Sequence, residues 1–212
     1  MTADKNIYSI FDEPKIVEKI KKKLPYLFQL AEIDNSRDGK LGMEVGSARE
    51  RIIIALLIHK FGTDEVKTDI PITKSETDVI VFDKPLSIKT GTGKKLNGVK
   101  LIWTVDPAKA LQFSKTYNPS CDIILVQINW DDIGYFYLLP KEVQEEVLKS
   151  LGRKKYIKLP KQGTNPRGVE LSSEALDQLT KHPKTKRIEI LWKREDVKYN
   201  SYDRWVDYWN EE

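Results

Sequence analysis

The sequence is poor in cysteine and histidine, with one Cys and two His among its 212 residues. The lone Cys121 excludes an intrachain disulfide framework, and His59 and His182 are too few for a zinc site. A catalytic metal would therefore have to be held by carboxylate oxygen, which favours Mg²⁺ or Mn²⁺ over zinc. This cysteine usage also indicates the reducing environment of the cytoplasm.

Long hydrophobic runs are missing as well. The longest run, Ile52–Ile58, is far shorter than the roughly 20 residues of a membrane helix, and no apolar leader with a cleavage site follows the charged N-terminus. We therefore expect neither a membrane protein nor a secreted one. Hydrophobic residues make up 40% and charged residues 32% of the chain, which is typical of one globular domain at this length.

Acidic residues are absent from two stretches of the chain, 84–105 and 149–168. The first contains five lysines and the second seven basic residues, although the net charge of the whole chain is only +4. Such stretches bind a phosphate backbone by releasing its counterions. A solvated surface explains either stretch alone. The two together favour nucleic acid as the partner.

The order of predicted elements indicates an α/β or α+β fold, with a central mixed β-sheet flanked by helices. The best-marked helix has a capping box of Ser47 and Glu50 at its start and Gly62 at its end. The other predicted elements are a helix over 7–28 broken by Pro14 and Pro25, strands over 66–72, 77–82, 86–90 and 99–104, a helix from Asp106-Pro107 to about Tyr117, strands over 122–129 and 135–139, helices over 140–151 and 172–180, and a strand over 187–192.

A hairpin is predicted where Asp83-Lys84-Pro85 separates two β runs, with its centre between residues 83 and 84. In that register Asp78 lies opposite Lys89, so a carboxylate and an ammonium share one face. Period-2 alternation assigns Val79, Val81, Leu86 and Ile88 to the core face, and Glu76, Asp78, Ser87 and Lys89 to the other face. The alternative interpretation of Asp78 and Lys89 is an ordinary salt bridge between strands.

Glu50 is a second carboxylate that is expected near this pair. At helical spacing it shares a face with Ile53, Ile54 and Leu57, which predicts that it points toward the sheet. The alternative role for Glu50 is to complete the capping box with Ser47.

These residues resemble the core of the PD-(D/E)XK nucleases, in which an acid begins one strand and an acid-X-Lys motif lies on the next. Here the matching residues are Asp78, Ser87-Ile88-Lys89 and the upstream helical Glu50. The stretch 88–106 is similar to the small type II restriction endonucleases of the ThaI family, which cut CGCG. Ser87 departs from the pattern, because it stands where the family usually has Asp or Glu. Glu50 or Glu76 would supply the missing carboxylate.

The resemblance implies a PD-(D/E)XK restriction-endonuclease-like core, a place in a restriction-modification system, and Mg²⁺-dependent cleavage of double-stranded DNA at a short palindrome, CGCG with blunt ends. Glu50, Asp78 and Lys89 would be catalytic. Glu50, Asp78 and the backbone carbonyl of Ile88 would hold one or two Mg²⁺ ions, with Mn²⁺ as a substitute and Ca²⁺ or Na⁺ as inactive ones. Lys89 would orient the attacking water or act as the base.

Several residues are candidates for DNA contacts. Lys100 and Thr104 would hold a phosphate, and Met43 would wedge between base pairs unless it only fills a gap in the core. The loop 162–168 contains side chains of the types that recognise bases, unless it is simply a polar surface loop. The full candidate set is Met43, Ser87, Lys94, Lys95, Lys100, Thr104, Gln162, Asn165 and Arg167.

We expect one nuclease domain over 1–212, with an N-terminal helical region and DNA-contacting loop (1–46), a catalytic core (47–140) and a part for DNA binding and dimerisation (141–212). A homodimer is expected because palindromes are bound by two-fold symmetric proteins. Two alternatives remain open: a structure-specific nuclease such as a Holliday junction resolvase, and a non-catalytic protein that binds double-stranded DNA.

Overall fold

The computed structural model describes residues 6–37, 40–42, 44–71, 76–160 and 168–211. Its centre is a mixed sheet of six strands in the order β11-β8-β7-β5-β4-β3, in which β5 and β7 are parallel and the other neighbours antiparallel. The strands are β3 (Val66–Lys67), β4 (Val79–Val81), β5 (Lys84–Thr92), β7 (Asp122–Ile128), β8 (Asp132–Leu139) and β11 (Lys186–Trp192). The predicted mixed sheet flanked by helices is confirmed.

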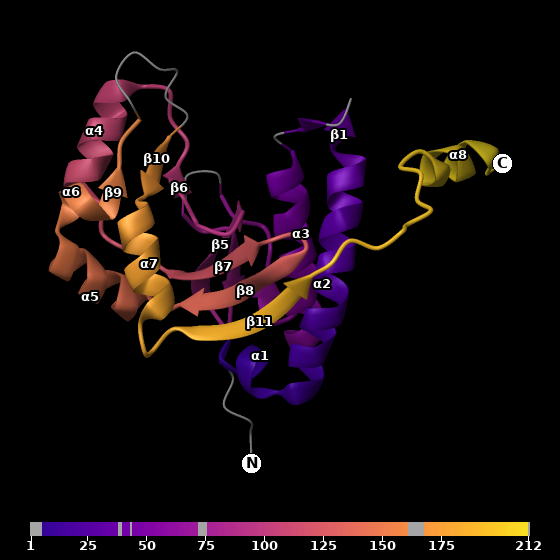
Figure 1. Ribbon diagram of the computed structural model, residues 1–212, viewed down its shortest axis with the longest axis horizontal. Coiled ribbons are helices and arrows are strands. Elements are labelled where there is room, and N and C mark those ends of the chain that lie inside the picture. The colour runs from indigo at the N-terminus through magenta and orange to yellow at the C-terminus, as the bar shows by residue number, and fades with distance from the viewer. Residues whose placement is uncertain (1–5, 38–39, 43, 72–75, 161–167, 212) are drawn as a thin grey trace.

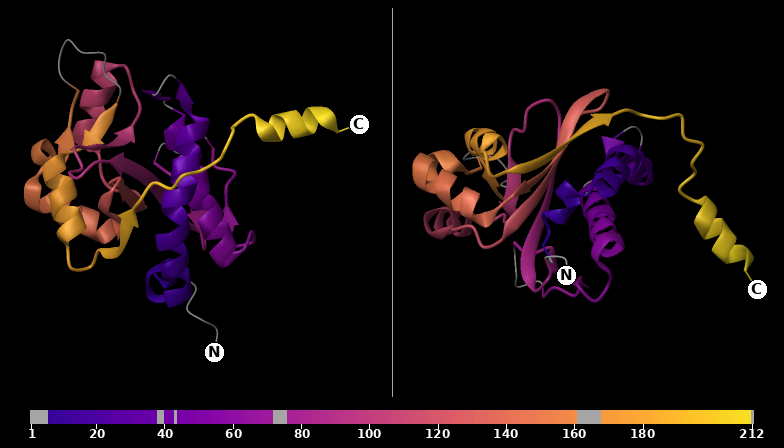
Figure 2. Two further views of the ribbon diagram at one scale, coloured as in Figure 1. Left: turned by 45° about the vertical axis from the view of Figure 1, so that its right-hand side comes forward. Right: turned by 90° about the horizontal axis from the view of Figure 1, so that it is seen from below.

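Helices cover both faces of this sheet (Figures 1 and 2). One face is covered by α1 (Ser9–Asp12), α2 (Pro14–Asp34) and α3 (Val45–Phe61), and the other by α4 (Pro107–Thr116), α5 (Lys141–Leu151), α6 (Arg153–Tyr156) and α7 (Ser173–Lys181). Alternate residues of β7 enter two different cores: Ile124 and Val126 pack with α2 and α3, whereas Ile123 and Leu125 pack with α5 and α7. The central strands are therefore buried on both sides.

Two smaller sheets and a C-terminal helix complete the described part of the chain. The two-stranded sheet pairs β1 (Ser36–Arg37) with β2 (Lys40–Leu41), and the three-stranded sheet has β10 (Val169–Leu171) between β6 (Val99–Ile102) and β9 (Ile157–Lys158). Helix α8 (Asp203–Asn210) stands away from the body at the end of an extended arm (Figure 1). Among the described helices, none combines the length and hydrophobicity required to cross a membrane.

The β4–β5 hairpin turns one residue earlier than predicted. Phe82 and Asp83 have φ angles of 52° and 61°, so the chain reverses between them through two left-handed residues, as in type I′ turns. Val79 pairs with Leu86, and continuing this register places Asp78 opposite Ser87 rather than Lys89. The prediction of the turn was wrong because no Gly or Asn marks the left-handed positions. The predicted faces are confirmed, since the register moved by two residues and the alternation kept its parity: Val79, Val81, Leu86 and Ile88 are all buried in one core.

Helix α3 begins at Val45, with Glu44 as its N-cap and no capping hydrogen bond from a side chain. The predicted capping box was therefore wrong, because the helix extends past Ser47 and leaves it inside the first turn. The predicted end is confirmed, since Gly62 is the C-cap with a φ of 87°. Glu50 consequently lies in the second turn, free of any capping role.

Helix α2 continues past Pro25, so the predicted break at this residue was wrong. Pro25 is buried in α2 together with Leu24 and Phe28, so tertiary packing compensates for the hydrogen bond that proline cannot donate. Pro14 occupies the first turn of α2, where it favours helix initiation. The predicted strand over 66–72 shortens to Val66–Lys67.

Candidate active site

The hairpin brings Asp78 and Lys89 into direct contact. Lys89 Nζ lies 3.0 Å from Asp78 Oδ2, and each side chain keeps 18% of its surface exposed. The same oxygen accepts hydrogen bonds from Ser87 Oγ at 3.0 Å and from the backbone N–H of Ile88 at 2.6 Å. Three donors on one oxygen fix the orientation of the carboxylate. The two residues are diagonal neighbours on adjacent strands, a separation that a lysine side chain spans easily.

Glu50 and Lys89 line the same open cavity, which has a volume of about 570 Å³. Burial and the negative charge of Asp78 raise the pKa of the Glu50 carboxyl, whereas the positive charge of Lys89 lowers it. Glu50 is therefore close enough to interact electrostatically with both Asp78 and Lys89. The structure brings together the three side chains that the sequence singled out for catalysis.

Glu76, the other candidate for the missing carboxylate, contacts residues outside the cavity that Glu50 lines. Its Oε2 accepts a hydrogen bond from Ser120. Burial and the charge of Asp78 raise the pKa of Glu76, whereas Ser120, Tyr117 and the charge of Lys89 lower it. Glu76 lines a narrow, separate hollow together with Lys89 and Cys121, not the open cavity that contains Glu50. Glu50 is thus the better-placed partner for Asp78.

The candidate ligands are oxygen donors of the type that magnesium binds. Within the described ranges, no three His, Cys, Asp or Glu side chains converge into a complete metal cage. Mg²⁺ does not require one, because it typically binds through one or two carboxylates and completes its shell with water and substrate phosphate. Glu50, Asp78 and the carbonyl of Ile88 supply oxygen donors of this kind.

The predicted DNA-contacting residues separate into different places. Lys100 lines the cavity of Glu50, and its ammonium lies 4.7 Å from the centre of the Trp103 ring. Lys94 and Lys95 line a different cavity, next to α7. Ser87 is only 2% exposed and donates to Asp78, which does not fit the predicted contact with DNA.

Two further observations concern the remaining candidates. Thr104 Oγ1 accepts a hydrogen bond from the backbone N–H of Asp106, the N-cap of α4, so this hydroxyl supports the turn into that helix. The other four candidates lie outside the described residues, and their predicted DNA contacts stay predictions: Met43, Gln162, Asn165 and Arg167.

The residues of the cavity wall that sequence reasoning missed include Trp103 and Glu170. Trp103 follows β6 and is 57% exposed, and its position beside Lys100 in an acid-free stretch was a usable signal. Glu170 lies on β10, pairs in register with Lys100, and forms an ion pair with Lys158 at 3.0 Å. A strand of three residues carries no periodicity that would have revealed it.

Comparison with solved structures identifies the class of protein. The chain is similar to one described as "Restriction endonuclease in complex with substrate DNA", with 54% sequence identity, a TM-score of 0.91, and coverage of 96% of this chain and 98% of that chain. The fold is therefore that of a restriction endonuclease. A search of curated proteins found no match.

The family follows from the sequence. A family model described as "Restriction endonuclease ThaI" matches residues 10–211. The chain belongs to the ThaI restriction endonuclease family. This result confirms the predicted type II restriction enzyme acting on DNA and favours it over the junction resolvase and the non-catalytic DNA binder.

Proposed function

We propose that this enzyme is a Mg²⁺-dependent homodimer that cuts both strands of duplex DNA at CGCG and leaves blunt ends. The observation that carries the proposal is the contact of Lys89 with Asp78 beside the cavity that Glu50 lines. The similar solved chain holds substrate DNA, which supports duplex DNA as the partner. The sequence CGCG and the blunt ends rest on the family resemblance, and the cytoplasmic location rests on the cysteine usage.

Glu50, Asp78 and the carbonyl of Ile88 would hold the magnesium. When bound, the ion lowers the pKa of a coordinated water and neutralises charge on the phosphate. Asp78 also holds the Lys89 ammonium at the cavity wall, with Oδ2 as the acceptor. Since Lys89 lines the cavity, its ammonium would donate to the attacking water or to the phosphate oxygens, on which negative charge grows in the transition state.

Lys100 extends the positive surface of the same cavity. It follows Lys89 on the next strand, β6, and the two lysines line one space. This arrangement suits a phosphate next to the scissile one, which carries no sequence information but fixes the position of the duplex. One chain presents one such cluster, whereas a double-strand break requires two, so two copies related by two-fold symmetry suit a palindromic target.

The test is cleavage of a plasmid that contains CGCG sites. In Mg²⁺ we expect discrete fragments with blunt ends at CGCG, and with excess EDTA we expect intact plasmid. A plasmid without CGCG and a synthetic four-way junction serve as controls, and both are expected to remain uncut. Cleavage that persists in EDTA, or that is restricted to the junction, would contradict the proposal.

A further inference from the structure

The C-terminal arm is anchored along α2 before it leaves the body. The Gln29 side chain exchanges two hydrogen bonds with the backbone of Glu195, donating at 2.7 Å and accepting at 2.9 Å. Farther along, the Tyr199 hydroxyl donates to Asp34 Oδ1 at 2.8 Å. These contacts hold the arm at the C-terminal end of α2 and set the point from which α8 departs.

Helix α8 presents an apolar face to solvent. All of its described side chains are exposed, including Val206 at 53%, Tyr208 at 63% and Trp209 at 89%. Helical spacing places Trp205, Tyr208 and Trp209 on one side, with Asp203 and Asp207 on the other. The helix stands off the body in every view (Figures 1 and 2). A cluster of exposed aromatic residues of this kind marks an interaction surface.

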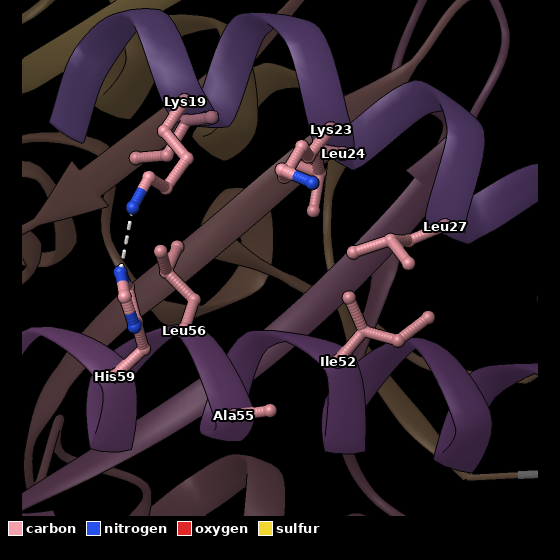
Figure 3. Close-up of a pocket in the computed structure, with 9 residues that line it drawn as sticks. Lys19, Lys23, Leu24, Leu27, Ile52, Ala55, Leu56 and His59 are labelled. Atoms are coloured by element: carbon pink, nitrogen blue, oxygen red, sulfur yellow. Dashed lines mark hydrogen bonds between the residues drawn. The ribbon is translucent and has the colours of Figure 1, made fainter. Parts of the chain in front are cut away.

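A groove of suitable chemistry lies between α2 and α3 (Figure 3). We call it the α2–α3 groove; its volume is about 290 Å³, and its apolar lining is Ile20, Leu24, Leu27, Ile52, Ala55 and Leu56. Lys19, Lys23 and His59 line it as well, and Lys19 Nζ lies 2.8 Å from His59 Nε2. An apolar channel with basic residues beside it suits an amphipathic helix that carries acids.

Charge and position identify the occupant. Helix α8 and the residue after it contribute Asp203, Asp207 and Glu211, which complement the lysines of the groove and disfavour an anionic membrane or DNA. The arm is anchored at Asp34, and Tyr202 and Trp205 at the start of α8 line a hollow with α2 and α3 of the same chain. The rest of α8 is directed away from its own body, so its exposed side chains are open to a second copy. We propose that α8 of each chain docks in the α2–α3 groove of a second copy. This arm exchange rests on the homodimer of the proposed function.

The amount of buried surface is adequate for a specific dimer. An aromatic side chain buries about 150–250 Å², and Tyr202, Tyr208 and Trp209 are all exposed by 63% or more. Two exchanged arms therefore supply roughly 1,000 Å² from these aromatics alone, which reaches the size of a specific interface. The exchange is isologous, because each chain gives one helix and receives one.

The test uses single-cysteine chemistry on the full chain. The native Cys121 is buried, so a bismaleimide with a flexible spacer reacts chiefly at introduced positions. One preparation carries Ala55→Cys in the groove and the other carries Asn210→Cys on α8; both positions are exposed. Mixing the two is expected to give a linked species of twice the chain mass, at several times the yield of either preparation alone.

Two companion measurements keep the result interpretable. Adding Trp209→Asp to the α8 variant is expected to lower the yield of the linked species at least tenfold and to weaken the dimer about 100-fold in sedimentation equilibrium, as for loss of a central aromatic anchor. Trp103→Asp, another exposed tryptophan, is the matched control and is expected to leave the dimer unchanged. The double variant Ala55→Cys/Asn210→Cys at high dilution reports whether α8 folds onto its own chain.

Three outcomes would overturn arm exchange: a dimer without the mixed cross-link, a link formed within one chain, or a monomeric protein at micromolar concentration. Plasmid cleavage is measured in parallel so that the two proposals can fail separately. A cross-linked dimer that leaves the plasmid intact would refute the nuclease proposal only. Normal cleavage without the cross-link would refute the arm exchange only.

Discussion

Replacing Asp78 with asparagine is expected to lower the rate of DNA cleavage by roughly 1,000-fold or more, while binding of the duplex is retained. The substitution preserves the shape of the side chain but removes its negative charge. In the wild type, this charge would bind the metal ion and holds the Lys89 ammonium, whose Nζ lies 3.0 Å from Asp78 Oδ2. Lys89→Ala is expected to have the same effect through loss of the ammonium. Single-turnover cleavage measures the rate, and a gel-shift assay with the CGCG duplex measures binding.

Asp83→Asn is the matched control for Asp78→Asn. Asp83 lies on the same hairpin, its side chain is 83% exposed, and its φ of 61° is one that asparagine accepts readily. Asp83→Asn removes one carboxylate that does not line the cavity, so we expect cleavage close to that of the wild type. An Asp78→Asn protein that is folded and cuts as fast as this control would refute the role of Asp78.

Glu50→Gln is expected to lower the rate of cleavage about 100-fold or more, whereas Glu76→Gln is expected to retain most of it. Glu50 lines the open cavity with Lys89, but Glu76 lines the narrow hollow and accepts a hydrogen bond from Ser120. A glutamine at position 76 still accepts that bond, while a glutamine at position 50 cannot supply an anionic ligand. Cleavage measured over a Mg²⁺ titration distinguishes the two variants. The reverse ranking would assign the second metal ligand to Glu76.

Thermal melting shows whether Glu50→Gln acts through folding. The folded protein raises the pKa of Glu50 above its ordinary value of 4.5, so the native state binds this proton more tightly than the unfolded chain does. The stability that Glu50 contributes therefore falls as pH rises above 4.5, and removing its charge at neutral pH is expected to raise the Tm of the metal-free protein. Below pH 4.5 the two proteins are expected to melt alike. A lower Tm at pH 7 would indicate a folding defect instead.

The face of the β4–β5 hairpin was predictable because alternation depends only on parity. Val79 and Val81 alternate with Asp78 and Ile80, so an error of two residues in register left the polar face intact. The exact partner of Asp78 was not predictable, because the turn places Phe82 at positive φ. Tertiary packing explains this choice: the Phe82 ring lies 4.8 Å from the ring of Phe61, at the end of α3.

Other parts of the site depend on contacts that are distant in the sequence. Glu170 reaches the cavity only because β10 pairs with β6, about 70 residues earlier in the chain. The sequence allowed two roles for Glu50, and only the observed start of α3 at Val45 separates it from the helix cap. Short strands and helix starts are set by such tertiary contacts more than by local pattern, whereas the long buried strand β7 and the helix end at Gly62 are encoded locally.

The most direct test of the catalytic centre is anomalous diffraction from crystals of the enzyme with a CGCG duplex and Mn²⁺. Manganese replaces magnesium at oxygen ligands and is visible by its own scattering. We expect a manganese peak at coordination distance from the carboxylates of Asp78 and Glu50 and from the carbonyl of Ile88, adjacent to the phosphate that is cut. A scissile phosphate that lies away from Lys89, or manganese bound at other residues, would contradict the proposed centre.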